Sequence, residues 1–187
     1  MKTERYGLIG KVLAHSFSPS FFEKKFRKEG IRNVSYELFP LPKIDEFEGL
    51  RNDTSILGWN VTVPYKTSII PYLNRLSLEA KEIGAVNTIK REKDGLIGYN
   101  TDHIGFRLSL LPLLNQRSSI KALVLGTGGA SKAICYALNK MDVQYKCVSR
   151  TGVLSYEELD QSIVEACLLY TSPSPRDATL SRMPSSA

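Results

Sequence analysis

The sequence predicts an α/β protein, with an N-terminal substrate domain of alternating strands and helices followed by an incomplete Rossmann-type dinucleotide-binding domain. Short apolar runs of strand length alternate with stretches of helical periodicity along the 187-residue chain. One run, 120–125, ends in a glycine cluster and leads straight into a helical pattern. Other runs end in polar side chains, and ligands of α/β proteins gather beyond the carboxyl ends of strands.

The first apolar run, 6–10, predicts a short buried strand, and a helix is expected over 20–28. Ser16 and Ser18 lie between these two elements. Hydroxyls ahead of a helix either cap it or donate to a carboxylate bound at its N-terminus. Both interpretations stay open from these residues alone.

Residues 56–66 read ILGWNVTVPYK, and the alternation around Val61 and Val63 predicts a strand that Pro64 ends. Lys66 follows directly. A lysine just beyond a strand end is well placed to meet a ligand, although a surface lysine would fit the same position.

Two further runs, 83–89 and 95–106, are strand-like, and each contains an Asn-Thr pair. Asn87 lies in an apolar context, so its amide is expected to be hydrogen-bonded within the protein or to face a ligand. Asp102 precedes a helix expected over 104–114, where it either caps the helix or serves a site. This helix is expected to link the two domains.

The glycine turn begins the second domain. A helix is expected from Ala130 to about Met141 and a second strand over 145–148. Amides of such a turn and of the helix start face a phosphate, although a turn without a ligand has the same pattern. Ser131 stands where the usual motif has its third glycine or alanine. Arg150, with no acid beside it, suits a 2′-phosphate and favours NADP over NAD, unless it is a solvated loop residue.

Composition narrows the classes of function. The net charge of +6 is spread along the chain without a nucleic-acid motif, and it suits a carboxylate substrate and a phosphorylated cofactor. No apolar run approaches the roughly 18 residues of a membrane span, and no signal peptide is expected. Three cysteines without disulfide or metal-ligand spacing and two isolated histidines indicate reduced thiols, no metal and a cytoplasmic location.

The last segment, 167–187, differs from the rest of the chain. It is rich in Ser, Thr and Pro and lacks apolar periodicity, so it is expected to be disordered or foreign to the protein. Its string LLYTSPSPRD resembles translated sequencing-adapter read-through. On this interpretation the dinucleotide-binding domain stops after two strands and the start of a helix at 155–159, and the natural protein is longer.

Taken together, the motifs SxSP, NVTVPYK, GAVNT, NTDxxGF and GTGGAS, closed by SRT, resemble the shikimate dehydrogenase family, which includes shikimate/quinate dehydrogenases. The order and spacing of the motifs match over residues 5 to about 165. The resemblance implies NADP-dependent, reversible reduction of 3-dehydroshikimate to shikimate on the way to chorismate and the aromatic amino acids, in a full-length form that can be a homodimer.

The resemblance also implies roles for individual residues. The catalytic pair is Lys66 and Asp102. The substrate site includes Ser16, Ser18, Asn60, Thr62, Asn87 and Asp102, with the two serines at the carboxylate. The cofactor site includes Gly126, Thr127, Gly128, Gly129, Ala130, Ser131, Ser149, Arg150 and Thr151, where Ser149 replaces the Asn of the family's Asn-Arg-Thr segment.

The expected domains are a substrate domain over 1–104, a truncated NADP-binding domain over 105–166 and the segment 167–187. Substrate and nicotinamide are expected to meet between the two domains. Two other functions stay open from the sequence. One is a quinate/shikimate dehydrogenase, and the other is a non-catalytic fragment that binds substrate without turning it over.

Overall fold

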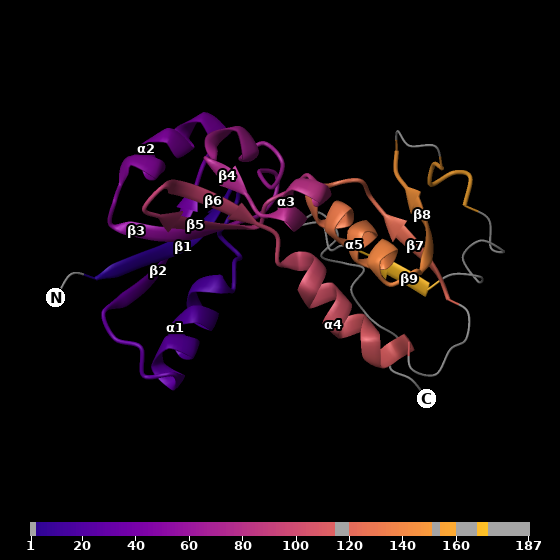
Figure 1. Ribbon diagram of the computed structural model, residues 1–187, viewed down its shortest axis with the longest axis horizontal. Helices are drawn as coiled ribbons and strands as arrows, with labels where there is room; N and C mark the ends of the chain where they lie inside the picture. The colour runs from indigo at the N-terminus through magenta and orange to yellow at the C-terminus, as the bar shows by residue number, and fades with distance from the viewer. Residues whose placement is uncertain (1–2, 115–119, 151–153, 160–167, 172–187) are drawn as a thin grey trace. The chain divides into compact units, whose positions relative to one another are not determined.

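A computed structural model describes residues 3–114, 120–150, 154–159 and 168–171 of the chain (Figure 1). The chain divides into two compact units, Met1–Gly105 and Phe106–Ala187. No helix in the described ranges is long and apolar enough to cross a membrane.

The first unit is a six-stranded mixed sheet with helices around it. The strand order is β2-β1-β3-β5-β6-β4, and β5 runs antiparallel to both of its neighbours while the other pairs are parallel. Its elements are β1 (Glu4–Gly10), α1 (Ser18–Lys28), β2 (Val34–Pro40), a 3₁₀ turn (Ile44–Glu46), α2 (Phe47–Asn52), β3 (Ile56–Val61), a second 3₁₀ turn (Ile70–Tyr72), β4 (Arg75–Leu76), α3 (Leu78–Ile83), β5 (Thr88–Glu92), β6 (Gly95–Tyr99) and the start of α4 (Asp102–Leu114).

The core of this unit lies on the side of the sheet that α2 covers. Phe47 of α2 packs edge-on against Trp59 of β3, and both are almost completely buried. Helix α1 lies across the sheet from α2 in Figure 1 and buries none of its residues fully. The two helices therefore contribute unequally, since α2 buries Phe47 in this core and α1 buries no residue fully.

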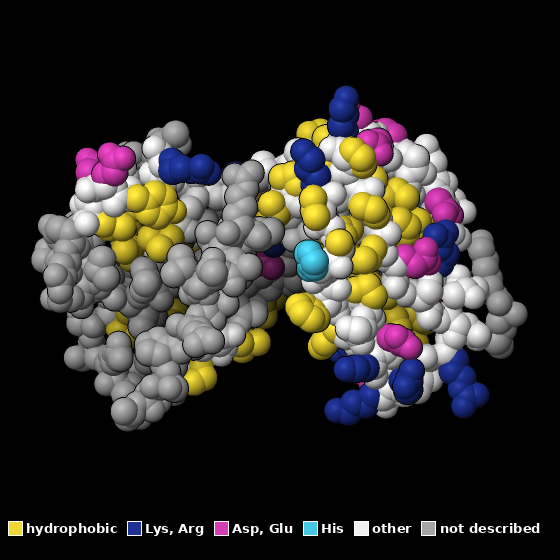
Figure 2. Space-filling model, turned by 180° about the vertical axis from the view of Figure 1, so that it is seen from behind, with side chains coloured by type: hydrophobic (Ala, Val, Ile, Leu, Met, Phe, Trp, Pro, Cys, Tyr) yellow, Lys and Arg dark blue, Asp and Glu magenta, His cyan; other side chains and the backbone are white. Residues whose placement is uncertain are grey.

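The basic cluster on α1 is a solvent-facing helix surface. Lys25 pairs with Glu29 and Arg27 pairs with Glu23, both at the four-residue spacing that brings side chains together on a helix. On the face shown in Figure 2, Lys and Arg side chains stand in separate groups with Asp and Glu among them.

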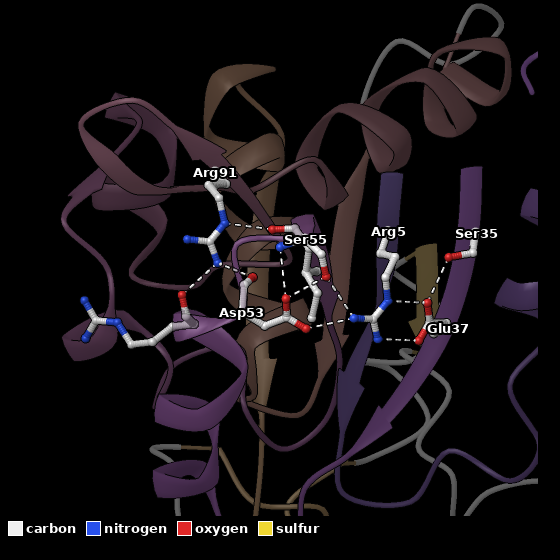
Figure 3. A network of polar contacts seen from close by, with 8 residues as sticks. Arg5, Ser35, Glu37, Asp53, Ser55 and Arg91 are labelled. Atoms are coloured by element: carbon white, nitrogen blue, oxygen red, sulfur yellow. Dashed lines mark hydrogen bonds and ion pairs between the residues drawn. The ribbon is translucent and has the colours of Figure 1, made fainter. Parts of the chain in front are cut away.

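An arginine network ties the amino-terminal ends of three strands together (Figure 3). Arg5 of β1 makes a two-pronged bond with Glu37 of β2, at 2.8 and 2.7 Å, and also contacts Asp53 and Ser55 ahead of β3. Arg91 of β5 donates to the Arg51 and Asp53 carbonyls at the end of α2 and to the Ile56 carbonyl at the start of β3. These bonds lie at the end of the parallel strands opposite to the loops that carry Ser16 and Lys66.

One strand prediction is wrong at its start. The run 83–89 reads as a strand, but its first residue ends α3, and Gly84 follows with φ 67°, a left-handed conformation that suits glycine. The strand β5 begins only at Thr88. Apolar periodicity is ambiguous over such short runs, and the Ser77 side chain that accepts a bond from the Ala80 N–H fixes the helix instead.

The second unit contains a strand, helix, strand arrangement built on the glycine turn. Strands β7 (Lys121–Leu125) and β8 (Gln144–Val148) are parallel, and α5 (Gly129–Lys140) connects them. Leu110 of α4 packs with Ala122, Val124, Ile134 and Leu138 in a small apolar core.

The expectation of disorder for 167–187 needs a correction at 168–171, whereas the expectation of a foreign segment stays a prediction. Residues Leu168–Thr171 form β9, a parallel strand on the other edge of β7, so the sheet has the order β8-β7-β9. Tyr and Thr, the last two residues of this strand, have high strand propensity, and the second edge of β7 supplies hydrogen-bonding partners. The helix expected at 155–159 is a turn in which the Ser155 N–H donates to Glu158. Residues 160–167 and 172–187 lie outside the described residues.

Candidate active site

Lys66 forms an ion pair with Asp102. The Lys66 Nζ lies 2.7 Å from the Asp102 Oδ2, and the two side chains are 16% and 30% exposed. The ammonium is therefore partly withdrawn from water and still accessible from one side. An ammonium has three N–H donors, and the described residues supply this single hydrogen-bond partner, so the others can meet an incoming oxygen.

The backbone places Lys66 just beyond the end of β3. A turn follows Val61, with a cis Val63–Pro64 bond and a hydrogen bond from the Tyr65 N–H to the Thr62 carbonyl. The Lys66 carbonyl then accepts a 2.7 Å bond from the Val86 N–H. This bond joins the lysine to the segment that leads into β5.

Asn87 fixes the carboxylate of Asp102. Its Nδ2 donates to the Asp102 Oδ1 at 2.8 Å and to the Thr101 Oγ1 at 2.9 Å. Its Oδ1 accepts from the Thr101 N–H at 2.8 Å and from the Thr88 hydroxyl at 3.0 Å. Both N–H groups of the amide are therefore used inside the protein, and Asn87 orients Asp102.

Asn100 supports the same carboxylate through the backbone. Its Oδ1 accepts from the Asp102 N–H, and its Nδ2 donates to the Ala85 carbonyl, both at 3.0 Å. Asp102 is the first residue of α4, and its carboxylate faces Lys66 and Asn87. The role of Asp102 in a site stays a prediction, and Asn100 is the side chain that accepts a backbone N–H at the start of α4.

The hydrogen bonds continue from Asn87 toward α1. Asn60 Nδ2 donates to Thr88 Oγ1 at 3.3 Å, and the Tyr36 hydroxyl donates to Asn60 Oδ1 at 2.7 Å. Burial raises the pKa of Tyr36 to about 12, and a hydrogen bond with the Ser18 side chain opposes that rise. The result is a continuous polar chain formed by Ser18, Tyr36, Asn60, Thr88, Asn87, Asp102 and Lys66.

Ser16 and Thr62 lie on the loops that follow β1 and β3. The Ser16 hydroxyl accepts from the Ser18 N–H at 3.2 Å, which shapes the entry to α1. The Thr62 N–H donates to the Ile9 carbonyl at 2.8 Å, and its methyl group lies against Gly10, where an added Cβ would come within 2.6 Å. Because β1 and β3 are parallel neighbours, their following loops lie at one edge of the sheet.

The glycine turn at 126–128 has the backbone that a close approach to phosphate requires. Gly126 has φ +103°, and its N–H donates to the Val148 carbonyl at 2.7 Å. Thr127 and Gly128 are exposed, and Gly129 and Ala130, partly buried, start α5, which has no acidic residue in its first turn. The helix start is therefore open and favourable to an anion.

Ser131 is buried next to this turn. A Cβ added at Gly126 would lie 3.4 Å from the Ser131 hydroxyl. The serine at the third position of the motif is therefore accommodated because the first position, 126, is a glycine. At the end of β8, Ser149 is buried and its N–H donates to the Leu154 carbonyl, while Arg150 is exposed. Thr151 lies outside the described residues.

The sequence matches the family described as shikimate dehydrogenase substrate binding domain over residues 8–89. A shikimate dehydrogenase (NADP(+)) of Clostridium botulinum is 42% identical over 144 residues, which are 76% of this chain and 55% of that protein. A chorismate mutase/shikimate 5-dehydrogenase fusion protein from Clostridium acetobutylicum has a similar structure, with a TM-score of 0.81 and 32% identity over 100% of this chain and 73% of that one.

The chain belongs to the shikimate dehydrogenase family.

Another member of this family, shikimate 5-dehydrogenase from Thermus thermophilus in complex with NADP(H) and shikimate, has a TM-score of 0.69 and 30% identity. That match covers 91% of this chain and 63% of the Thermus chain. The chain spans about half the length of the curated relatives it matches, as the 55% coverage of the Clostridium botulinum protein illustrates.

Two members of the polar chain, Thr88 and Tyr36, escaped the sequence reasoning, as did Thr101, which bonds to Asn87 beside the chain. Thr88 and Thr101 are the second residues of the two Asn-Thr pairs, and that repetition was the available signal. Tyr36 had no comparable signal, because a tyrosine inside a strand pattern most simply indicates packing. Among the described residues, no group of three or more His, Cys, Asp or Glu could hold a metal ion.

Proposed function

We propose that this protein is an NADP-dependent shikimate dehydrogenase that reversibly reduces 3-dehydroshikimate to shikimate. The observation that carries the proposal is the Lys66–Asp102 ion pair, in which Asn87 holds the Asp102 carboxylate. Lys66 and Asn87 lie within the residues 8–89 that match the family. The names of the relatives supply the substrate and the cofactor.

The residues of the first unit account for the proton side of the reaction. As the C3 ketone is reduced, negative charge develops on its oxygen, and the Lys66 ammonium stabilises that charge and donates the proton. Asp102 orients the Lys66 ammonium and accepts a hydrogen bond from the substrate hydroxyl next to C3. Ser16 and Ser18 hold the substrate carboxylate. Asn60 and Thr62 contact the ring hydroxyls. The main role of Asn87 is to orient the Asp102 carboxylate.

The second unit has residues that fit NADP. The left-handed Gly126, the exposed turn and the helix start without acids suit a pyrophosphate, and the exposed Arg150 suits a 2′-phosphate. When bound, NADPH supplies the hydride. We assign residues 1–104 to the substrate domain and 105–166, together with β9, to the cofactor domain.

A turnover assay tests the proposal directly. Purified protein is mixed with 3-dehydroshikimate and NADPH, and oxidation of the cofactor is followed by absorbance, with quinate plus NADP as a comparison. We expect a higher kcat/KM for 3-dehydroshikimate with NADPH than for quinate with NADP. Turnover of quinate alone, or turnover that prefers NADH, would contradict the assignment.

Substrate binding without turnover is a second candidate, because all seven members of the polar chain lie within Met1–Gly105. A calorimetric titration with shikimate separates the two functions. Binding together with turnover supports the enzyme, and binding by a protein that does not turn over supports this second candidate.

The proposal also includes a cytoplasmic location and, for the full-length form, a homodimer. Sedimentation of the purified protein tests the dimer, whose mass should be twice that of one chain.

A further inference from the structure

Two cysteine side chains face each other in the second unit. Cys135 lies on α5 and Cys147 lies on β8, and their sulfur atoms are 3.3 Å apart. Both are free thiols and partly buried against the core of this unit. The spacing of twelve residues along the chain gave no sign of this pair.

The fold brings the two thiols together. Cys135 follows Ile134, which is buried against β7, and Cys147 is aligned with Val124 in the neighbouring strand. The helix and the strand are thereby held side by side by packing that does not involve the sulfur atoms. A disulfide has a sulfur–sulfur bond of about 2.05 Å, so the two sulfurs have only a small distance to close.

The surroundings of the pair determine the order of its chemistry. Burial and the hydrogen bond with Cys147 raise the pKa of the Cys135 thiol to about 12. Cys135 therefore stays protonated at neutral pH and reacts poorly as the first nucleophile.

We propose that Cys135 and Cys147 form a reversible redox-modification site, which a small-molecule disulfide oxidises to an intramolecular bond between α5 and β8. The Cys147 thiolate attacks the small disulfide and releases one thiolate, leaving a mixed disulfide on Cys147. The Cys135 sulfur loses its proton to solvent, attacks the Cys147 sulfur and releases the second thiolate. In total the protein loses two protons and two electrons, and the small disulfide is reduced to two thiols.

The bond would join the helix that follows the glycine turn to strand β8, which ends at Val148. A cross-link restricts the unfolded chain more than the folded one, so the oxidised unit should resist unfolding better. This consequence does not depend on the proposed enzyme activity.

The test uses the 187-residue chain with Cys167→Ser, and the unsubstituted chain in parallel in case the variant fails to fold. Each is incubated with oxidised glutathione and then examined by mass spectrometry and non-reducing peptide mapping. We expect a loss of about 2 Da, a Cys135–Cys147 peptide and an upward shift of the urea midpoint that dithiothreitol reverses.

Two matched variants complete the experiment. Cys135→Ser and Cys147→Ser should each lose the cross-linked peptide and the shift of the midpoint. Stable glutathione adducts on both sulfurs of the native chain would overturn the proposal. Two unmodified thiols in the native chain, under conditions in which the urea-unfolded chain forms the bond, would also overturn it.

Discussion

At the scale of single residues, Lys66 is the side chain on which the proposed chemistry depends most. We expect Lys66→Ala to lower the turnover number about 10²–10⁴-fold, because general acid catalysis is worth that much, with a smaller effect on KM. Steady-state kinetics with 3-dehydroshikimate measures both values. Lys93→Ala, which removes an exposed lysine elsewhere in the same unit, is the control and should leave both unchanged.

Arg150 is predicted to read the phosphate that distinguishes NADP from NAD. We expect Arg150→Ala to weaken NADPH binding about 10–100-fold, because a hydrogen bond to a charged group is worth about 1.5–3 kcal/mol, and to change NADH binding little. Fluorescence titration of both cofactors measures the two affinities. Lys146→Ala removes a nearby exposed charge and serves as the control, and equal losses for both cofactors at Arg150 would refute the prediction.

The hydroxyl of Tyr36 contributes a hydrogen bond in addition to the packing of its ring. Tyr36→Phe keeps the stacking on Phe22, with ring centres 4.2 Å apart, but removes the donor to Asn60. We expect a loss of about 0.5–1.5 kcal/mol in the free energy of unfolding at neutral pH, measured by urea denaturation.

The pH dependence of that loss follows from the pKa of Tyr36. The folded value of about 12 lies above the ordinary 10.0, so the stabilisation is present below pH 10 and is lost as the pH rises toward 12. The wild-type protein should therefore lose its advantage over Tyr36→Phe in this range. A constant difference across the range would contradict the prediction.

Sequence reasoning found some of these residues and missed others for a physical reason. Lys66 and Asp102 stand at strand and helix ends, where a polar side chain has few structural duties, so their motifs point to chemistry. Tyr36 lies inside β2, where a half-buried aromatic residue suits the sheet itself. Its partner Asn60 comes from β3, and only the fold brings the two side chains together.

At the scale of elements, the Arg5 network joins β1, β2 and the approach to β3. We expect Arg5→Met to lower the free energy of unfolding by about 1–2 kcal/mol at neutral pH, a modest value because the pairs are about one third exposed. Urea denaturation measures the loss. Arg75→Met removes the exposed pair with Asp94, at 3.6 Å, and should change stability much less.

The loss caused by Arg5→Met should depend on acidity. The hydrogen bond from Arg5 holds the pKa of Glu37 below its ordinary 4.5. The stabilisation is therefore present above pH 4.5 and disappears as the pH falls below that value. An equal loss at neutral and at strongly acidic pH would indicate that the side chain acts by packing alone.

The elements themselves were only partly predictable. The strand, glycine turn and helix at 120–141 follow directly from local patterns, and α5 begins one residue before the expected position. Strand β9 was missed because four residues carry too little periodicity, and its place depends on the edge of β7, which lies more than forty residues away in sequence. Pairing over such separations is a property of the fold.

At the scale of the whole molecule, the polar chain belongs entirely to one unit. We expect shikimate to slow amide hydrogen exchange within residues 1–105 and to leave residues 106–187 nearly unchanged, because a ligand stabilises the part that it binds. Exchange measured by mass spectrometry with and without ligand checks this. NADP in place of shikimate is the matched control, and it should slow exchange around α5.

The polar chain also has a direction. Tyr36 donates to Asn60, Asn60 to Thr88, Thr88 to Asn87, and Asn87 to Asp102, so four successive hydrogen bonds run in one sense and end on a carboxylate. Aligned bonds polarise one another, and their dipoles add toward the anion. The Tyr36 hydroxyl of β2 is thus linked by consecutive hydrogen bonds to the carboxylate of Asp102, the first residue of α4. Side chains of β2, β3 and β5 therefore help to stabilise the negative charge of Asp102, in addition to the role of the sheet in positioning the loops that follow its strands.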